Sequence, residues 1–132
     1  MPKIRANGID IHYQIGGRGP RLLYISGSGG DLRNPRGLFE GPLPEHFEVL
    51  GYDQRGLGQT DTPDGDYSMA DYAADADALL VALDWPSAPV VGVSFGGMVA
   101  QEFALRYPDR VQALVLACTS SGGQGGASYS AS

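Results

Sequence analysis

One serine in this sequence stands where a side-chain hydroxyl could act as a nucleophile. Ser94 has a glycine two residues before it and another two residues after it, Gly92 and Gly96. The apolar, β-branched residues 89–93 predict a strand, and residues 95–107 carry apolar side chains at helical spacing. A chain that turns from strand to helix so sharply is strained, and the glycines remove side chains that would collide. The pattern predicts a nucleophile elbow, which holds the hydroxyl above the carboxyl end of a sheet.

A backbone amide beside this serine adds a second part of the same chemistry. The N–H of Phe95 stands at the start of the predicted helix, where it can stabilise a developing oxyanion. Gly97 extends the cluster of small residues around the turn. The alternative interpretation of Gly-x-Ser-x-Gly is a turn into a helix without chemistry. The predicted strand before the motif and the predicted helix after it favour the elbow.

A second glycine-rich loop follows another buried strand. Residues 26–30 read Ser-Gly-Ser-Gly-Gly, directly after the apolar run of residues 21–25. Backbone N–H groups in such a loop can point at an anion. The loop is not a P-loop, because no Gly-Lys-Ser/Thr follows it, and its glycine spacing does not match a dinucleotide fingerprint.

Local signals predict the elements that position these two loops. Asn7-Gly8 favours the positive φ angles of a type I′ hairpin turn, and Ser68 with Asp71 makes a capping-box pattern at a helix start. Because strands alternate with helices, we predict an α/β fold, a three-layer αβα sandwich with a mostly parallel sheet. Strands are predicted at residues 4–6, 9–15, 21–25, 47–53, 89–93 and 112–118, and helices at 36–40, 68–83 and 95–107.

Composition limits the classes of partner. The chain has 132 residues, a net charge of −6 and no basic cluster, which argues against nucleic acid and anionic membranes. No stretch approaches ~20 apolar residues and no signal-peptide pattern opens the sequence, so we expect a cytoplasmic protein. Cys118 is interpreted as a small core residue. Asp71, Asp75 and Asp77 are interpreted as a solvated helix face rather than a metal site, and no cofactor is expected.

Three motifs and the order of the elements carry a resemblance to a known family. Residues 92–97 fit its elbow, residues 52–58 are similar to its Asp-x-Arg-Gly-x-Gly loop, and residues 107–111 are similar to its helix-to-strand turn. Nearly all of residues 4–118 resembles the amino-terminal half of the α/β-hydrolase fold, truncated after the sixth strand. The resemblance thus implies that residues 1–118 are the amino-terminal part of such a domain. The Gly/Ser-rich residues 119–132 are interpreted as a flexible tail.

The resemblance implies a function for the two loops. It is closest to small-molecule ester and lactone hydrolases of the enol-lactonase type, and a serine rather than an aspartate at position 94 sets the chain apart from dehalogenases and epoxide hydrolases. Ser94 is then the nucleophile, and the N–H groups of Ser28 and Phe95 form the oxyanion hole. Ser26-Gly27 stands where the family usually has His-Gly. Relatives that use the same serine on carbon–carbon bonds, peptides or peroxide remain alternatives.

A general base for this serine is not found in the sequence. The family's acid and histidine follow its seventh and eighth strands, but no acidic residue follows Asp109 here and no histidine follows His46. His46 precedes a strand, so roughly 20 Å of strand length separates it from the level of the elbow. His12 belongs to the peripheral hairpin, and Asp53 is expected to pair with Arg55.

Three interpretations follow from the missing base. The chain is the amino-terminal half of an esterase or lactonase, or a non-catalytic ligand-binding module that has lost its triad, or a chain completed by pairing with another chain. A binding module gains nothing from a strained elbow, which favours the enzyme. The unpaired edge of the last strand and the uncovered apolar surface predict self-association or pairing with a complementary carboxyl-terminal chain.

Overall fold

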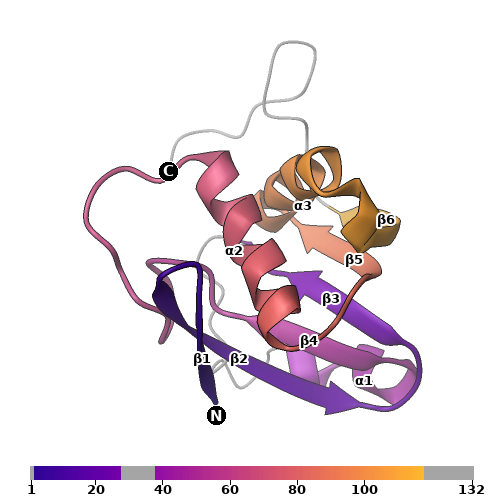
Figure 1. Ribbon diagram of the computed structural model, residues 1–132. Coiled ribbons are helices and arrows are strands. Elements are labelled where there is room, and N and C mark those ends of the chain that lie inside the picture. The colour runs from indigo at the N-terminus through magenta and orange to yellow at the C-terminus, as the bar shows by residue number, and fades with distance from the viewer. Residues whose placement is uncertain (1, 28–37, 118–132) are drawn as a thin grey trace.

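The computed structural model describes residues 2–27 and 38–117 of the chain (Figure 1). Six strands form one sheet in the order β1-β2-β4-β3-β5-β6. Strand β2 is antiparallel to β1 and β4, whereas β4, β3, β5 and β6 are parallel to one another. The predicted α/β fold with a mostly parallel sheet is therefore confirmed. The strands are β1 (Lys3–Ala6), β2 (Ile9–Gly17), β3 (Arg21–Ile25), β4 (Glu48–Tyr52), β5 (Ala88–Val93) and β6 (Val111–Ala117).

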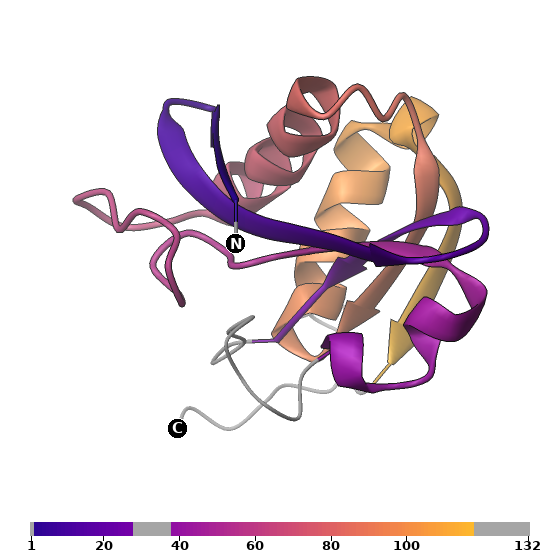
Figure 2. The same ribbon diagram turned by 90° about the horizontal axis from the view of Figure 1, so that it is seen from below.

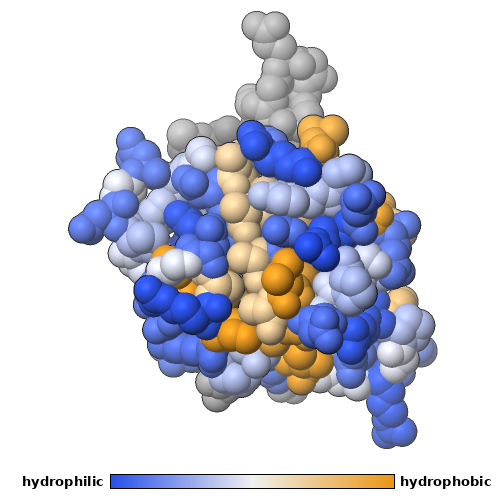
Figure 3. Space-filling model, in the orientation of Figure 1, coloured by the Kyte–Doolittle hydropathy of each residue, from blue (hydrophilic) through white to orange (hydrophobic). Residues whose placement is uncertain are grey.

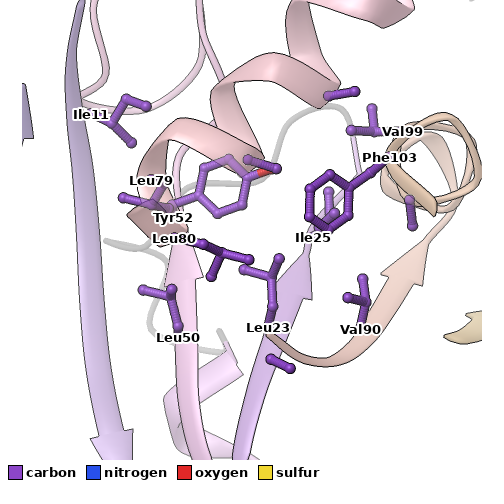
Figure 4. Close-up of a cluster of buried hydrophobic side chains, with 14 of the residues drawn as sticks. Ile11, Leu23, Ile25, Leu50, Tyr52, Leu79, Leu80, Val90, Val99 and Phe103 are labelled. Atoms are coloured by element: carbon purple, nitrogen blue, oxygen red, sulfur yellow. The ribbon is translucent and has the colours of Figure 1, made fainter. Parts of the chain in front are cut away.

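Two long helices cover one face of this sheet (Figure 2). Helices α2 (Met69–Ala82) and α3 (Phe95–Arg106) pack against each other and enclose the main core with the strands. The side chains meet in Figure 4, where the sheet supplies Leu23, Ile25, Leu50 and Val90 and the helices supply Leu79, Leu80, Val99 and Phe103. The surface in the view of Figure 3 is mostly hydrophilic, with a strip of mildly hydrophobic residues running down its middle and strongly hydrophobic residues near the lower end of that strip. In the part of the chain that the structure describes, no helix has the length and apolar character needed to cross a bilayer.

Two predicted local motifs appear in the structure. Asn7 and Gly8 have φ angles of 51° and 77°, and Ala6 pairs with Ile9 across the turn, as a type I′ hairpin requires. At the start of α2 the Asp71 N–H donates to Ser68 Oγ at 3.2 Å, and the Ser68 N–H donates to the Asp71 carboxylate at 2.9 Å. The capping box is therefore complete.

One short helix is not predicted from the sequence. Helix α1 (Leu43–His46) begins in a proline-rich segment, with Pro42 as its N-cap. The first turn of a helix tolerates proline, because its N–H groups have no intrahelical acceptor. The predicted helical piece at 36–40 is a 3-10 turn, η1 (Leu38–Glu40), and its first two residues lie outside the described ranges. A second 3-10 turn, η2 (Pro108–Arg110), precedes β6.

The last strand exposes apolar side chains. Strand β6 pairs with β5 only, among the described residues, and Leu114, Val115 and Leu116 are 37%, 56% and 40% exposed. The predicted uncovered apolar surface is thus present. Self-association through it stays a prediction, and Cys118 and the predicted tail lie outside the described residues.

Candidate functional site

Ser94 occupies a strained turn between β5 and α3. Its φ and ψ angles are 56° and −123°, a conformation that side chains other than glycine rarely adopt. The Ser94 N–H donates to the Ala117 carbonyl at 2.9 Å, and the Ser94 carbonyl accepts from the Gly97 N–H at 2.9 Å. The strain predicted for this strand-to-helix turn is therefore present, as a positive φ angle at Ser94. The end of β6 and the first turn of α3 fix the strained backbone from both sides.

Three glycines allow the backbones around Ser94 to approach one another. A Cβ atom at Gly92 would lie 2.6 Å from the Gly96 carbonyl oxygen and 2.8 Å from Gly97 Cα. A Cβ atom at Gly96 would overlap the backbone at the end of β3, where Ile25 is the last residue. At Gly27, in the loop after β3, the added atom would be 3.2 Å from Ser94 Cβ. Larger side chains would push these segments apart, so the glycines are steric requirements of the site.

The ring of Phe95 is fixed by an aromatic chain. It packs edge-on against Tyr72 of α2, with ring centroids 5.1 Å apart, and Tyr72 packs edge-on against Tyr67 at 5.9 Å. Phe95 is the first residue of α3, so its N–H belongs to the turn that lacks intrahelical acceptors. Ser28, the other residue assigned to the oxyanion hole from the sequence, lies outside the described residues.

Gln54 is a residue at this site that was not predicted from the sequence. It follows Asp53 just beyond the carboxyl end of β4, and it is 1% exposed. Its side-chain Nε2 donates to the Ser26 carbonyl at 2.8 Å, which ties the β4 loop to the β3 loop. No local pattern signals this contact, because the two residues are 28 positions apart in the sequence.

The predicted pairing of Asp53 with Arg55 is wrong. The Asp53 carboxylate instead lies 2.7 Å from Nδ1 of His12 on β2, and both side chains are 1% exposed. It also accepts the Gln59 N–H at 3.0 Å, and a side chain at Gly58 would overlap it. The histidine on the adjacent strand β2 satisfies the buried carboxylate, and the Arg55 guanidinium turns to a different carboxylate.

Arg55 pairs with α2 instead. It donates to both oxygens of Asp75, at 2.6 and 2.8 Å, and Asn7 of the hairpin turn donates to the same carboxylate at 2.9 Å. The hydrogen bonds to Asp75 raise the pKa of Arg55. The interpretation of Asp75 as part of a solvated face is therefore wrong, because its side chain is 2% exposed. Within the described ranges, no group of three His, Cys, Asp or Glu side chains is placed to hold a metal ion.

Neither histidine lies within reach of Ser94. His46 ends α1 just before the amino end of β4, whereas Ser94 follows the carboxyl end of β5. The two residues therefore lie at opposite ends of the parallel strands, separated by roughly 20 Å of strand length. His12 lies on β2, and β4 and β3 stand between β2 and β5. Three strand spacings, about 14 Å in all, therefore separate the strand of His12 from the strand that leads to Ser94. The site therefore combines a strained serine, a helix start and a tightly packed loop.

Comparison with known proteins agrees with this geometry. The family model for the alpha/beta hydrolase fold matches residues 20–126, and the chain belongs to this family. It is 38% identical over 101 residues to a poly(3-hydroxyalkanoate) depolymerase of Ectopseudomonas oleovorans, covering 76% of this chain and 35% of that protein. The structure of the enol-lactonase from Burkholderia xenovorans LB400 superposes with a TM-score of 0.81 and 31% identity, over 91% of this chain and 47% of that one.

A third relative shows the same partial coverage. The meta-cleavage product hydrolase from Pseudomonas fluorescens IP01 superposes with a TM-score of 0.82 and 31% identity, over 91% of this chain and 45% of that chain. The 132 residues thus span less than half the length of each of these three proteins. They correspond to one portion of an α/β hydrolase, and this portion carries the strand–serine–helix turn.

Proposed function

We propose that this chain supplies the nucleophile and the oxyanion hole of a serine hydrolase that acts on small carboxylic esters or lactones. The observation that carries the proposal is the backbone of Ser94, held at φ 56° between β5 and α3. Strain of this kind persists only where the surrounding structure imposes it, and it is concentrated at functional sites. The likeness to an enol-lactonase supports the choice of lactones and esters as substrates.

The proposed reaction is acyl transfer through an acyl-enzyme. Ser94 Oγ attacks the substrate carbonyl carbon while a base takes the hydroxyl proton. The carbonyl oxygen becomes an oxyanion, which the N–H groups of Phe95 and Ser28 stabilise. Collapse of the tetrahedral intermediate breaks the bond to the leaving alkoxide, which receives the proton from the base. Water then releases the acid in the reverse sequence and restores the Ser94 hydroxyl.

The proposal assigns the base and its acid to polypeptide outside these 132 residues. His12 is buried against Asp53, and His46 lies at the opposite end of the sheet from Ser94. A site with an oxyanion hole but no base retains roughly 10³–10⁴-fold acceleration over water, far below a complete triad. We therefore expect the chain alone to hydrolyse activated aryl esters feebly and to react slowly with fluorophosphonates.

The test compares the wild-type chain with Ser94→Ala on a short-chain aryl ester, with and without added imidazole as an external base. Imidazole in buffer hydrolyses the ester at a background rate. We expect the wild type with imidazole to exceed that background rate, and Ser94→Ala with imidazole to match it. Ser87→Ala, a serine replacement before β5, is the matched control and should behave as the wild type. Equal turnover by Ser94→Ala would refute the nucleophile assignment. Robust Ser94-dependent turnover without imidazole would show that a base lies within the chain.

A further inference from the structure

We propose that Gln54 is a positioning residue that holds the loop after β3 against the nucleophilic serine, an inference that rests on the proposed function. Gln54 donates from Nε2 to the Ser26 carbonyl at 2.8 Å, and its side chain is buried. A carbonyl oxygen only accepts, so the nitrogen end of the amide must face it. The bond joins the carboxyl ends of β4 and β3, immediately beside the elbow.

The Ser26 carbonyl is a sensitive point of that loop. The peptide unit is planar, so fixing the Ser26 carbonyl also fixes the direction of the Gly27 N–H on its other side. The same carbonyl lies against Gly96 at the start of α3, where an added Cβ atom would overlap it. Packing from α3 and the hydrogen bond from Gln54 thus hold one peptide plane between them.

This peptide plane sets the distance between the loop and the serine side chain. A Cβ atom at Gly27 would lie 3.2 Å from Ser94 Cβ and 3.7 Å from Ser94 Oγ. The Gly27 backbone, which immediately precedes the proposed oxyanion donor Ser28 in the sequence, therefore lies close to the Ser94 side chain. Because oxyanion donors act only at 2.7–3.1 Å from the developing charge, a loop free to shift by a fraction of an ångström loses stabilisation.

Stability alone does not explain a glutamine at this position. The Gln54 Oε1 atom is buried and has no hydrogen-bond partner among residues 2–27 and 38–117. A buried polar atom without a partner costs free energy, which offsets the stability that the single hydrogen bond to Ser26 contributes. What the amide adds is its bond to the loop beside Ser94. A residue whose net contribution to stability is small but whose hydrogen bond is attached to the site fits a positioning role.

The test replaces Gln54 with methionine, which keeps the length and removes the donor, and with glutamate, which keeps the shape. Gln112→Met is the matched control, because it also removes a 2.8 Å side-chain bond, from Gln112 to Ser87, at the amino end of β6. Three quantities are measured on the full chain: the thermal unfolding midpoint, amide hydrogen exchange of residues 23–27, and the rate of Ser94 labelling by a fluorophosphonate.

We expect Gln54→Met to speed exchange in residues 23–27 and to slow labelling about 10- to 100-fold. Its unfolding midpoint should change little, because removing the unpaired Oε1 atom offsets leaving the Ser26 carbonyl without its donor. Gln112→Met should leave exchange and labelling unchanged. Wild-type exchange and labelling in both Gln54 variants would overturn the proposal. A large fall in the thermal unfolding midpoint of both Gln54 variants would also overturn the proposal, because it would show that Gln54 has a structural role.

The two proposals fail in different ways. If Ser94→Ala is labelled and turns over substrate as the wild type does, the proposed function is wrong. Exchange in residues 23–27 then still decides whether Gln54 holds the loop. If Ser94→Ala is inert and Gln54→Met is labelled at the wild-type rate, the serine is the nucleophile and the positioning role is wrong.

Discussion

Replacing Gly96 by alanine tests how closely β3 and α3 must approach at the elbow. The new methyl group would overlap the carbonyl oxygens of Ile25 and Ser26 and lie 2.6 Å from the Ile25 carbonyl carbon. All three atoms are backbone, so no side-chain rotation relieves the overlap and the two elements must move apart. Overpacking of this kind costs about 1–3 kcal/mol. Because three backbone atoms are overlapped, we place the cost at about 2–3 kcal/mol, the upper part of that range. Alanine recovers at most about 1 kcal/mol of helix propensity, so we expect a net loss of at least about 1–2 kcal/mol.

Urea unfolding measures this loss, and fluorophosphonate labelling measures its effect on the site. Because the displaced carbonyl belongs to the loop beside Ser94, labelling should fall by at least tenfold even where the protein is fully folded. Gly41→Ala is the control, since the nearest atom to its added Cβ is the Leu38 carbonyl oxygen at an ordinary 3.6 Å. Its stability should change by less than about 0.5 kcal/mol. Wild-type stability and labelling in Gly96→Ala would refute the close approach of β3 and α3.

Two further predictions concern charged groups away from the serine. Asp53→Ala leaves the buried His12 without its acceptor, so we expect a loss of about 3–5 kcal/mol in urea unfolding, and a loss under 1 kcal/mol would contradict the buried pair. At the start of α2, hydrogen bonds from Ser68 lower the pKa of Asp71 below its ordinary 3.8. Because the pKa of Asp71 is lower in the folded protein than in the unfolded chain, its carboxylate stabilises the fold fully above pH 3.8. That stabilisation disappears as the pH falls through the pKa of the folded protein. Over that acid range the free energy of unfolding should therefore fall less for Asp71→Asn than for the wild type. An equally steep fall in both proteins would show that the carboxylate cap contributes nothing.

The parts of this molecule that were predicted from sequence are those specified by short segments. Asn7-Gly8 and the Ser68 capping box depend on backbone conformations and side chains within four residues, so their sequences suffice. The turn at Ser94 is similar, because its glycines and flanking strand and helix are contiguous. Parallel order followed from the alternation of strands and helices.

The contacts that were predicted wrongly or missed join distant segments. Asp53 pairs with a histidine 41 residues away, and Gln54 reaches a carbonyl 28 residues away. In each case the nearest charged or polar neighbour in sequence was not the partner, because the sheet order places β4 between β2 and β3. Asp75 was interpreted as solvated from its place on a helix, although the hairpin turn and the β4 loop bury it. Predicting such pairings requires knowledge of the strand order in the sheet, and no local sequence pattern contains that information.

The hydrogen bond from the Ser94 N–H to the Ala117 carbonyl has a consequence for the order in which the site is assembled during synthesis. Ala117 is the last residue of β6, 23 positions after the serine in the sequence. A nascent chain that has emerged only through α3 contains the serine and its glycines, but lacks the strand that fixes the turn on that side. Because domains fold as the chain is made, amino-terminal segments first, the strained geometry is completed late. A chain interrupted during translation before β6 would therefore carry Ser94 in a turn that lacks its hydrogen bond to β6.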